Sequence, residues 1–351
     1  MKGPFLIFCL FPWIQGCMLT YLIKSSYGQV DLLWHRVPIQ KMLLQEDLPQ
    51  EKRRKLQLVL DVRRFAQDQL HLNVDGNYSS YVEVGRPYVT YIVMAAPFNR
   101  LEPYLWHFPF IGSVPYKGFF SKKDAKEESF FLKKKGYDVY VRGTTAYSTL
   151  GWFKDPILST MLSYSDEDLV NVIIHESVHA TIFIKGHTKF NESLATYLAQ
   201  KGTELFFLKK EGQNTKILQH LRNEYHDDKL FSRFLGEVKL RLKSWYKERE
   251  KIPQKLTQEE KDKKLKEFQK YFSTKYHPQF KTNKYNFFLR IKHLNNAQLL
   301  SFSTYYANMD DFEKIDILFQ GDFSKILSFV KKMNQEEDPF EQLARLTNQV
   351  F

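Results

Sequence analysis

The segment His175-Glu-Ser-Val-His179 carries three side chains that could act together on a metal ion. Histidines four residues apart on a helix project from one face, with roughly 5–6 Å between their β-carbons, so both imidazoles can bind one tetrahedral zinc ion. Glu176 lies between them, where a carboxylate can reach a metal-bound water without taking a coordination place. The spacing therefore predicts a zinc site with Glu176 as the catalytic base.

A zinc site that keeps an open position needs a third protein ligand. Glu192 lies thirteen residues after His179, within Phe190–Ala199, a stretch that predicts a second helix. A turn at Lys185-Gly-His187 would let the two helices run antiparallel and bring Glu192 toward both histidines. His187 is a competing ligand, but its place in the turn favours an exposed or supporting role. We expect one Zn²⁺ per chain, held by the two histidines and Glu192.

A chance match on a buried helix, with both imidazoles satisfied by neighbouring groups, is the alternative interpretation. Ser165 lies three residues before Asp168, which is a capping-box pattern and predicts a helix that starts directly before Leu169–Ala180. This helix signal, the Asn-Glu pair downstream and an N-terminal export signal together favour a metal site.

The first 17 residues indicate export. One lysine is followed by roughly ten apolar residues, Phe5–Ile14, too few for a comfortable transmembrane helix. Ile14-Gln-Gly-Cys17 resembles the lipobox of bacterial lipoproteins, although Gln15 is unusual there. We expect residues 1–17 to be a signal peptide that ends at a lipidated Cys17, which anchors the protein to a membrane of the cell envelope, facing the periplasm. A retained anchor, an ordinary cleaved signal and a buried N-terminal helix are the alternatives.

Composition limits the kinds of site and partner. The two cysteines, Cys9 and Cys17, both lie near the N-terminus, so the folded body holds neither a disulfide nor a cysteine-ligated metal. The 52 basic and 40 acidic residues give a net charge of +12, but the lysines of Lys261–Lys270 alternate with acids and apolar residues. That pattern is typical of a solvated helix face, so we expect no nucleic-acid partner.

Hydrophobic periodicity predicts an α+β fold. A small β-sheet in the N-terminal half should pack on a predominantly helical C-terminal half, and we see no internal repeat. We treat residues 18–351 as one metallopeptidase domain, with a sheet-containing part at about 78–155 and a zinc-helix part at about 156–351. The expected strands are 88–94, 108–112 and 137–141, and the expected helices include 122–135, a polar pair over 214–275 broken at Pro253, and a final set from 297 to the end.

The zinc helix and the Asn191-Glu192 pair are accompanied by further recognisable segments, which are Trp106–Gly112, Tyr116–Phe120, Gly136–Tyr140, Ala146–Pro156, and Asn295–Leu299 with Tyr305. Together they resemble a family of bacterial zinc proteases called predicted aminopeptidases, of the gluzincin class. The resemblance covers nearly the whole chain. It implies that the predominantly helical C-terminal half is zincin-like. It also implies a lipoprotein with peptidase activity, with zinc ligands at His175, His179 and Glu192 and the base at Glu176.

The resemblance does not identify the residues that bind the substrate. An aminopeptidase needs a carboxylate to hold the α-amine of its substrate, and no Gly-x-Met-Glu-Asn-type segment supplies one. Residues 146–152 could form an edge for an extended peptide or an aromatic turn beneath the helix. Tyr147, Tyr197 and Tyr305 are candidates for a phenol that stabilises the oxyanion.

The predicted function is hydrolysis of peptide bonds, in peptide or protein substrates, by a zinc-activated water. Two other functions are consistent with the same residues. The protein could be a zinc-binding envelope lipoprotein that cleaves nothing, or a metal-dependent amidase that acts on cell-envelope material.

Overall fold

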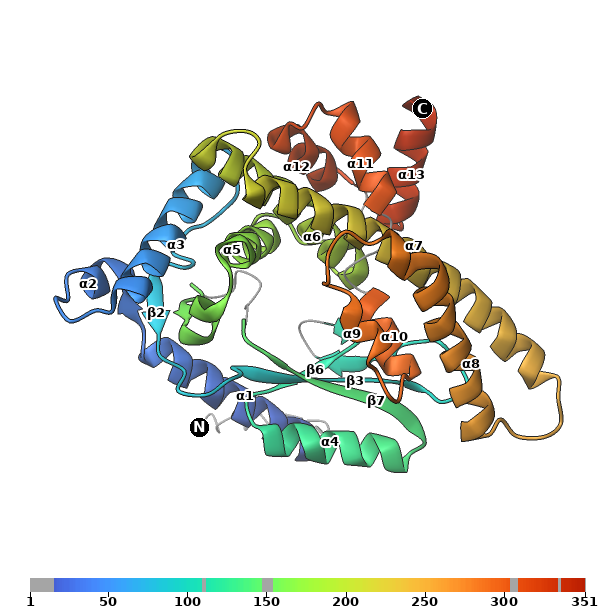
Figure 1. Ribbon diagram of the computed structural model, residues 1–351. Coiled ribbons are helices and arrows are strands. Elements are labelled where there is room, and N and C mark those ends of the chain that lie inside the picture. Colours follow the sequence, from blue (N-terminus) through green and yellow to red (C-terminus); the bar gives the residue numbers. More distant parts are fainter. Residues whose placement is uncertain (1–15, 109–111, 147–153, 304–308, 334–335, 351) are drawn as a thin grey trace, which may run out of the picture.

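The computed structural model describes residues 16–108, 112–146, 154–303, 309–333 and 336–350. Over these residues the chain has the expected α+β class, with small sheets in the N-terminal half and helices in most of the remainder (Figure 1). The helices are α1 (Gly16–Trp34), α2 (Ile39–Leu43), α3 (Gln50–Asp68), α4 (Lys122–Lys134), α5 (Asp166–Thr181), α6 (Thr188–Glu211), α7 (Lys216–Glu250), α8 (Gln258–Tyr271), α9 (Asn286–Leu289), α10 (Asn296–Ser303), α11 (Met309–Leu318), α12 (Phe323–Lys331) and α13 (Pro339–Val350).

The described strands form three small sheets rather than one. They are β1 (Val37–Pro38), β2 (Ser80–Val82), β3 (Thr90–Pro97), β4 (Trp106–Phe108), β5 (Gly112–Val114), β6 (Lys117–Phe119), β7 (Tyr137–Thr144) and β8 (Ile157–Leu158). The largest is the antiparallel sheet β6-β3-β7, β4 and β5 pair as a hairpin, and β2 joins antiparallel β1 to parallel β8. β1 and β8 lie outside the region 78–155, where the strands were expected. Each is a two-residue strand, too short to leave an alternating pattern that would predict it from the sequence.

The sheet β6-β3-β7 lies between helices. α4 packs on β3 and β7, and α10 also contacts both strands (Figure 1). The helix expected at 122–135 is therefore present as α4, which begins where the side chain of Ser121 accepts a hydrogen bond from the backbone N–H of Asp124. The long polar pair is present as α7 and α8, with Pro253 in the connection between them.

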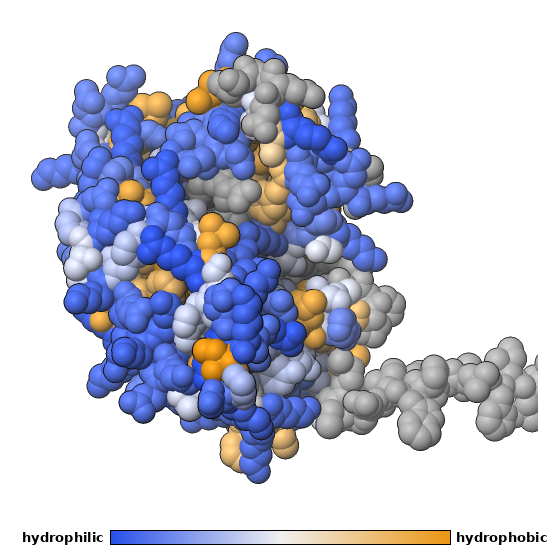
Figure 2. All heavy atoms as spheres, turned by 90° about the vertical axis from the view of Figure 1, so that its right-hand side faces the viewer, coloured by the Kyte–Doolittle hydropathy of each residue, from blue (hydrophilic) through white to orange (hydrophobic). Residues whose placement is uncertain are grey.

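The surface over α7 and α8 is largely hydrophilic, as the sequence pattern predicts (Figure 2). Lys261 is an exception, because its side chain is fully buried. Its ammonium group donates to the carboxylate of Asp138 on β7 at 2.5 Å and to the carbonyl oxygen of Phe98 at 2.7 Å. The backbone N–H of Asn296, at the start of α10, donates to the same carboxylate at 2.8 Å. One buried ion pair therefore fastens α8 and α10 to the sheet.

Helices α5 and α6 pack against each other, and α3 packs against α5. Ser165 begins α5 as expected, because its hydroxyl accepts from the backbone N–H of Asp168 at 3.0 Å. Gly202 on α6 lies where a β-carbon would come within 2.8 Å of Leu70 and 3.1 Å of Ile174. Glycine at this position lets α6 approach α5 closely, which matters because α5 and α6 carry the predicted ligands.

The expected signal peptide lies mostly outside the described residues, which begin at Gly16. Among the described helices, none combines the length and the apolar character that crossing a membrane requires.

We predict that Lys261→Ala lowers the free energy of unfolding by about 3–5 kcal/mol, because it leaves the Asp138 carboxylate without its counter-charge in a buried position. Urea unfolding followed by circular dichroism measures this loss. Lys263→Ala on the exposed side of the same helix is the matched control and should change stability by less than about 0.5 kcal/mol. Equal effects of the two substitutions would show that the ion pair does not hold the fold together.

Candidate metal site

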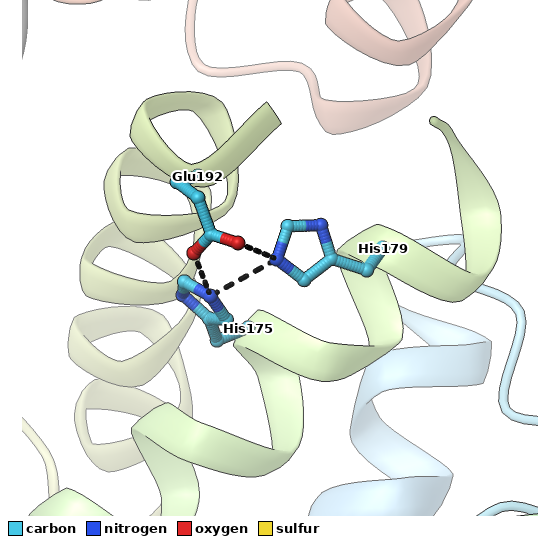
Figure 3. Close-up of side chains that lie close together, drawn as sticks. All are labelled: His175, His179 and Glu192. Atoms are coloured by element: carbon cyan, nitrogen blue, oxygen red, sulfur yellow. Dashed lines mark hydrogen bonds and ion pairs between the residues drawn. The ribbon is translucent and has the colours of Figure 1, made fainter. Parts of the chain in front are cut away.

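The three predicted ligands lie together at the contact between α5 and α6 (Figure 3). The Nε2 atoms of His175 and His179 are 3.1 Å apart. The Glu192 carboxylate points toward both rings, with one oxygen 3.5 Å from Nε2 of His175 and the other 3.6 Å from Nε2 of His179. Two nitrogens and a carboxylate therefore converge on one point, as the sequence spacing predicts.

The turn between the two helices fixes which residue of α6 faces the histidines. The side-chain amide of Asn191 is buried, and it donates to the carbonyl oxygen of Ile184 at 2.8 Å while its own oxygen accepts from the N–H of Ile184 at 2.9 Å. Gly186 adopts a left-handed conformation, with φ of 83°, within the same turn. This closed turn sets the register that places the neighbouring Glu192 opposite His179.

The site is electrostatically suited to a cation. Burial acts to raise the pKa of Glu192, but hydrogen bonds and charge from His175 and His179 hold that pKa well below its ordinary value. Burial acts to lower the pKa of His179, but Glu192 and the charge of Glu176 outweigh it, so the pKa is raised. Four nitrogen and oxygen acceptors at this separation repel one another unless a proton or a metal ion lies among them. Two imidazoles and a carboxylate are a donor set that zinc accepts.

Glu176 lies on α5 between the histidines and is half-buried. Its charge affects the pKa of two tyrosines that no sequence pattern indicates as site residues. The pKa of Tyr78 is raised by burial and then by Glu176 and Asp155, and the pKa of Tyr164 is raised by burial, with smaller contributions that include Glu176. Tyr78 also has a left-handed backbone, with φ of 55°, a conformation that non-glycine residues rarely adopt. No spacing rule in the sequence links either tyrosine to the zinc helix.

The remaining candidates are not brought to the ligands. His187 is the N-cap residue of α6. It does not belong to the group of described residues whose ligand atoms lie close enough together to bind one ion. Tyr197 is buried in the core with its ring stacked on Phe312, and its electrostatic neighbours are Asp316 and Tyr225. Tyr147 and Tyr305, with most of the segment 146–152, lie outside the described residues.

An acid-lined cavity of about 350 Å³ lies farther along the same helix pair. Seven acidic side chains and two lysines line it. Asn171 precedes His175 by one helical turn and Thr196 follows Glu192 by one turn, so the cavity begins roughly 6 Å along each helix from the ligands. Two buried acceptors in its lining, Oε1 of Gln200 and Oδ1 of Asp316, have no hydrogen-bond partner among the described residues. The cavity is therefore suited to a positively charged group that can donate hydrogen bonds.

We predict that the purified protein binds about one zinc ion per chain and that His175→Ala, His179→Ala or Glu192→Ala abolishes this binding, because too few ligands remain. His187→Ala is the matched control and should keep its zinc.

Zinc content should also fall from about pH 7.5 to about pH 5.5, because protons compete for imidazoles and the raised pKa of His179 strengthens that competition. Elemental analysis after dialysis measures both effects, and full zinc content in the Glu192→Ala variant would contradict the third-ligand assignment.

Comparison with known proteins agrees with the likeness seen in the sequence. A family model described as "Putative aminopeptidase" matches residues 20–345, which is nearly the whole chain. Neither the curated proteins nor the solved structures include a match. The match spans the three sheets, the two helices that carry the candidate ligands and most of the C-terminal helices, so the chain belongs to the family described as "Putative aminopeptidase".

Proposed function

We propose that the protein is a zinc-dependent aminopeptidase whose metal is held by His175, His179 and Glu192. The observation that carries the proposal is the convergence of these three side chains, with Glu176 on the same helix. Membership of the aminopeptidase family supports peptide-bond hydrolysis as the reaction class.

When bound, zinc would lower the pKa of a water molecule and polarise the carbonyl group of the scissile peptide bond. Glu176 would accept a proton from the attacking water at its carboxylate and deliver it to the nitrogen of the leaving amine. The Glu192 carboxylate on α6 and the His179 ring are largely buried. The candidate site is therefore shielded from bulk solvent on the side where α5 and α6 pack together. Glu176 helps to raise the pKa of both Tyr78 and Tyr164, and these two described phenols are our candidates to donate to the developing oxyanion.

The number of ligands supports a catalytic rather than a structural zinc. Structural zinc sites usually have four protein ligands, whereas catalytic sites have three and keep one position for water or substrate. The described residues offer three. A zinc-binding lipoprotein without activity would need neither the open position nor a half-buried glutamate between the two histidines.

The acid-lined cavity supports aminopeptidase action in particular. A free α-amine is cationic at neutral pH, and the sequence alone supplies no obvious carboxylate to bind it. Asp168 on α5 and Glu224 on α7 line the cavity. Burial raises the pKa of Glu224, although Lys284 lies 3.9 Å from its carboxylate and acts to lower it. These carboxylates are the described groups that we assign to the substrate's amine.

We also propose that the protein is exported and held at the cell-envelope membrane by a lipid on Cys17, facing the periplasm. The apolar run of Phe5–Ile14 and the lipobox-like Ile14–Cys17 support this location.

We predict that Glu176→Gln retains about one zinc ion per chain but lowers turnover of peptides by ~10²-fold or more, because the base is lost while the ligands remain. The paired measurement is zinc content and kcat on the same preparation. Glu211→Gln, exposed on α6 and outside both the ligand group and the cavity, is the control and should keep near-normal turnover. An undiminished rate in Glu176→Gln would exclude this residue as the base.

If both the wild type and Glu176→Gln hold zinc and neither cleaves any member of a peptide library, the zinc-binding lipoprotein becomes the better description. Cleavage of cell-envelope amides but not of peptides would indicate the amidase.

We predict that N-acetylation of a peptide substrate lowers kcat/KM by at least about 10-fold, since it removes the charge that the cavity would bind. Asp168→Asn and Glu224→Gln should raise KM for free-amine peptides with less effect on kcat, whereas the exposed Glu259→Gln on α8 should change neither. Steady-state kinetics on matched free and acetylated peptides measures this. Equal cleavage of both peptides would indicate an endopeptidase.

A further inference from the structure

Helix α1 is apolar on two opposite faces, and only one of them is used inside the protein. On the inner face, Tyr21 donates its hydroxyl proton to the carbonyl oxygen of Gly118 at 2.9 Å, and Leu32 is buried in the main core. Gly28 lies against the ring of Phe120, where any larger side chain would collide. This face attaches α1 to the sheet and to the body of the protein.

The outer face carries a stripe of large apolar side chains that contact no core. Ile23, Tyr27, Val30 and Trp34 are 58 to 83% exposed. Their spacing of four, three and four residues places them in one row along the helix. Isolated exposed apolar residues are common on protein surfaces. A continuous row of them is unusual on a helix whose opposite face is already packed, and such a row indicates an interaction site.

We propose that this outer stripe of α1 lies in the interface of a lipid bilayer, with the helix parallel to the membrane surface. The proposal goes beyond peptide hydrolysis and rests on the proposed envelope location. α1 contains Cys17, the residue proposed to carry the lipid, so the stripe lies directly beside the proposed membrane anchor. Tyrosine and tryptophan in the row are the residue types enriched where a membrane meets water.

The charges beside the stripe indicate apolar contact rather than attraction to anionic headgroups. Lys24 is bound to Asp124 of α4 at 2.9 Å, and Asp31 on α1 and Arg36 just after it carry opposite charges. These pairs leave little net charge next to the row. Binding should therefore depend on burial of the apolar side chains and should occur on uncharged lipid.

A second copy of the chain is a less suitable occupant. A specific protein interface uses about 20–30 residues on each side, whereas the stripe offers one row on a single helix. A bilayer needs no shape complementarity, and a single row of side chains can enter its interface.

Quenching of Trp34 by brominated phosphatidylcholine tests the proposal directly. The full chain carrying Trp13→Phe, which removes the tryptophan of the N-terminal apolar run, is reconstituted into vesicles with or without brominated acyl chains. We expect the brominated lipid to quench part of the emission, and we expect this quenched part to disappear when Trp34→Phe is added. Trp34 emission that brominated lipid leaves unchanged would overturn the proposal.

Partitioning of the chain from residue 17 onward carrying Cys17→Ser, which lacks both the apolar run Phe5–Ile14 and the lipid, gives a second test. Ile23→Asn with Val30→Asn should weaken sedimentation with phosphatidylcholine vesicles at least about 10-fold. Leu240→Asn on α7 is the matched control, because Leu240 is 71% exposed far along the chain, and it should have no effect. Binding that requires anionic lipid and is lost in high salt, or equal binding by the stripe and control variants, would overturn the proposal.

Measurements of folding, peptidase activity and membrane binding distinguish a failure of the membrane interface from a failure of the proposed peptidase function. The stripe variants should keep the circular dichroism spectrum and the peptidase activity of the parent in detergent. Activity without membrane binding by the parent would refute only the membrane interface. Membrane binding without activity would refute only the peptidase.

Discussion

The structure depends on one constraint, which is that two imidazoles and a carboxylate must be held against one another at a largely buried helix contact. Removing such groups from water is unfavourable unless each is compensated, so their positions cannot drift independently. The register of α6 on α5 provides the alignment, and Asn191 closes the turn between them by bonding both backbone groups of Ile184. Gly202 allows the close approach of the two helices. The three candidate ligands are thus positioned by helices rather than by loops.

A second polar cluster, separate from the candidate ligands, supports the sheet. Asp138 accepts from Lys261 and from the backbone of Asn296, and the Asn296 side chain in turn donates to carbonyl oxygens that include that of Pro97. Two of the segments that carry the family resemblance, residues 136–140 and 295–299, meet in this cluster. Their role there is to join strands and helices, so resemblance to a peptidase family at these positions reflects the scaffold rather than the chemistry.

Local patterns in the sequence predicted the elements that depend on nearby residues. The His-Glu-x-x-His spacing, the Ser165 cap and the turn before α6 are set within about thirty residues, and the structure has all three. Long-range features were not predictable in this way. Burial of Lys261 depends on a strand more than a hundred residues earlier, and the effect of Glu176 on the pKa of Tyr78 joins residues almost a hundred positions apart. The assignments of Tyr147 and Tyr305 stay predictions, because both residues lie outside the described ranges.

The most direct test of the central claim is a crystal structure of the zinc-loaded protein with anomalous data collected at the zinc absorption edge. The three-ligand site predicts one strong anomalous peak within ~2.0–2.2 Å of Nε2 of His175, Nε2 of His179 and a carboxylate oxygen of Glu192. Glu176 should lie close to the peak without coordinating it. A peak held by other residues, or a Glu192 carboxylate turned away from the metal, would contradict the site.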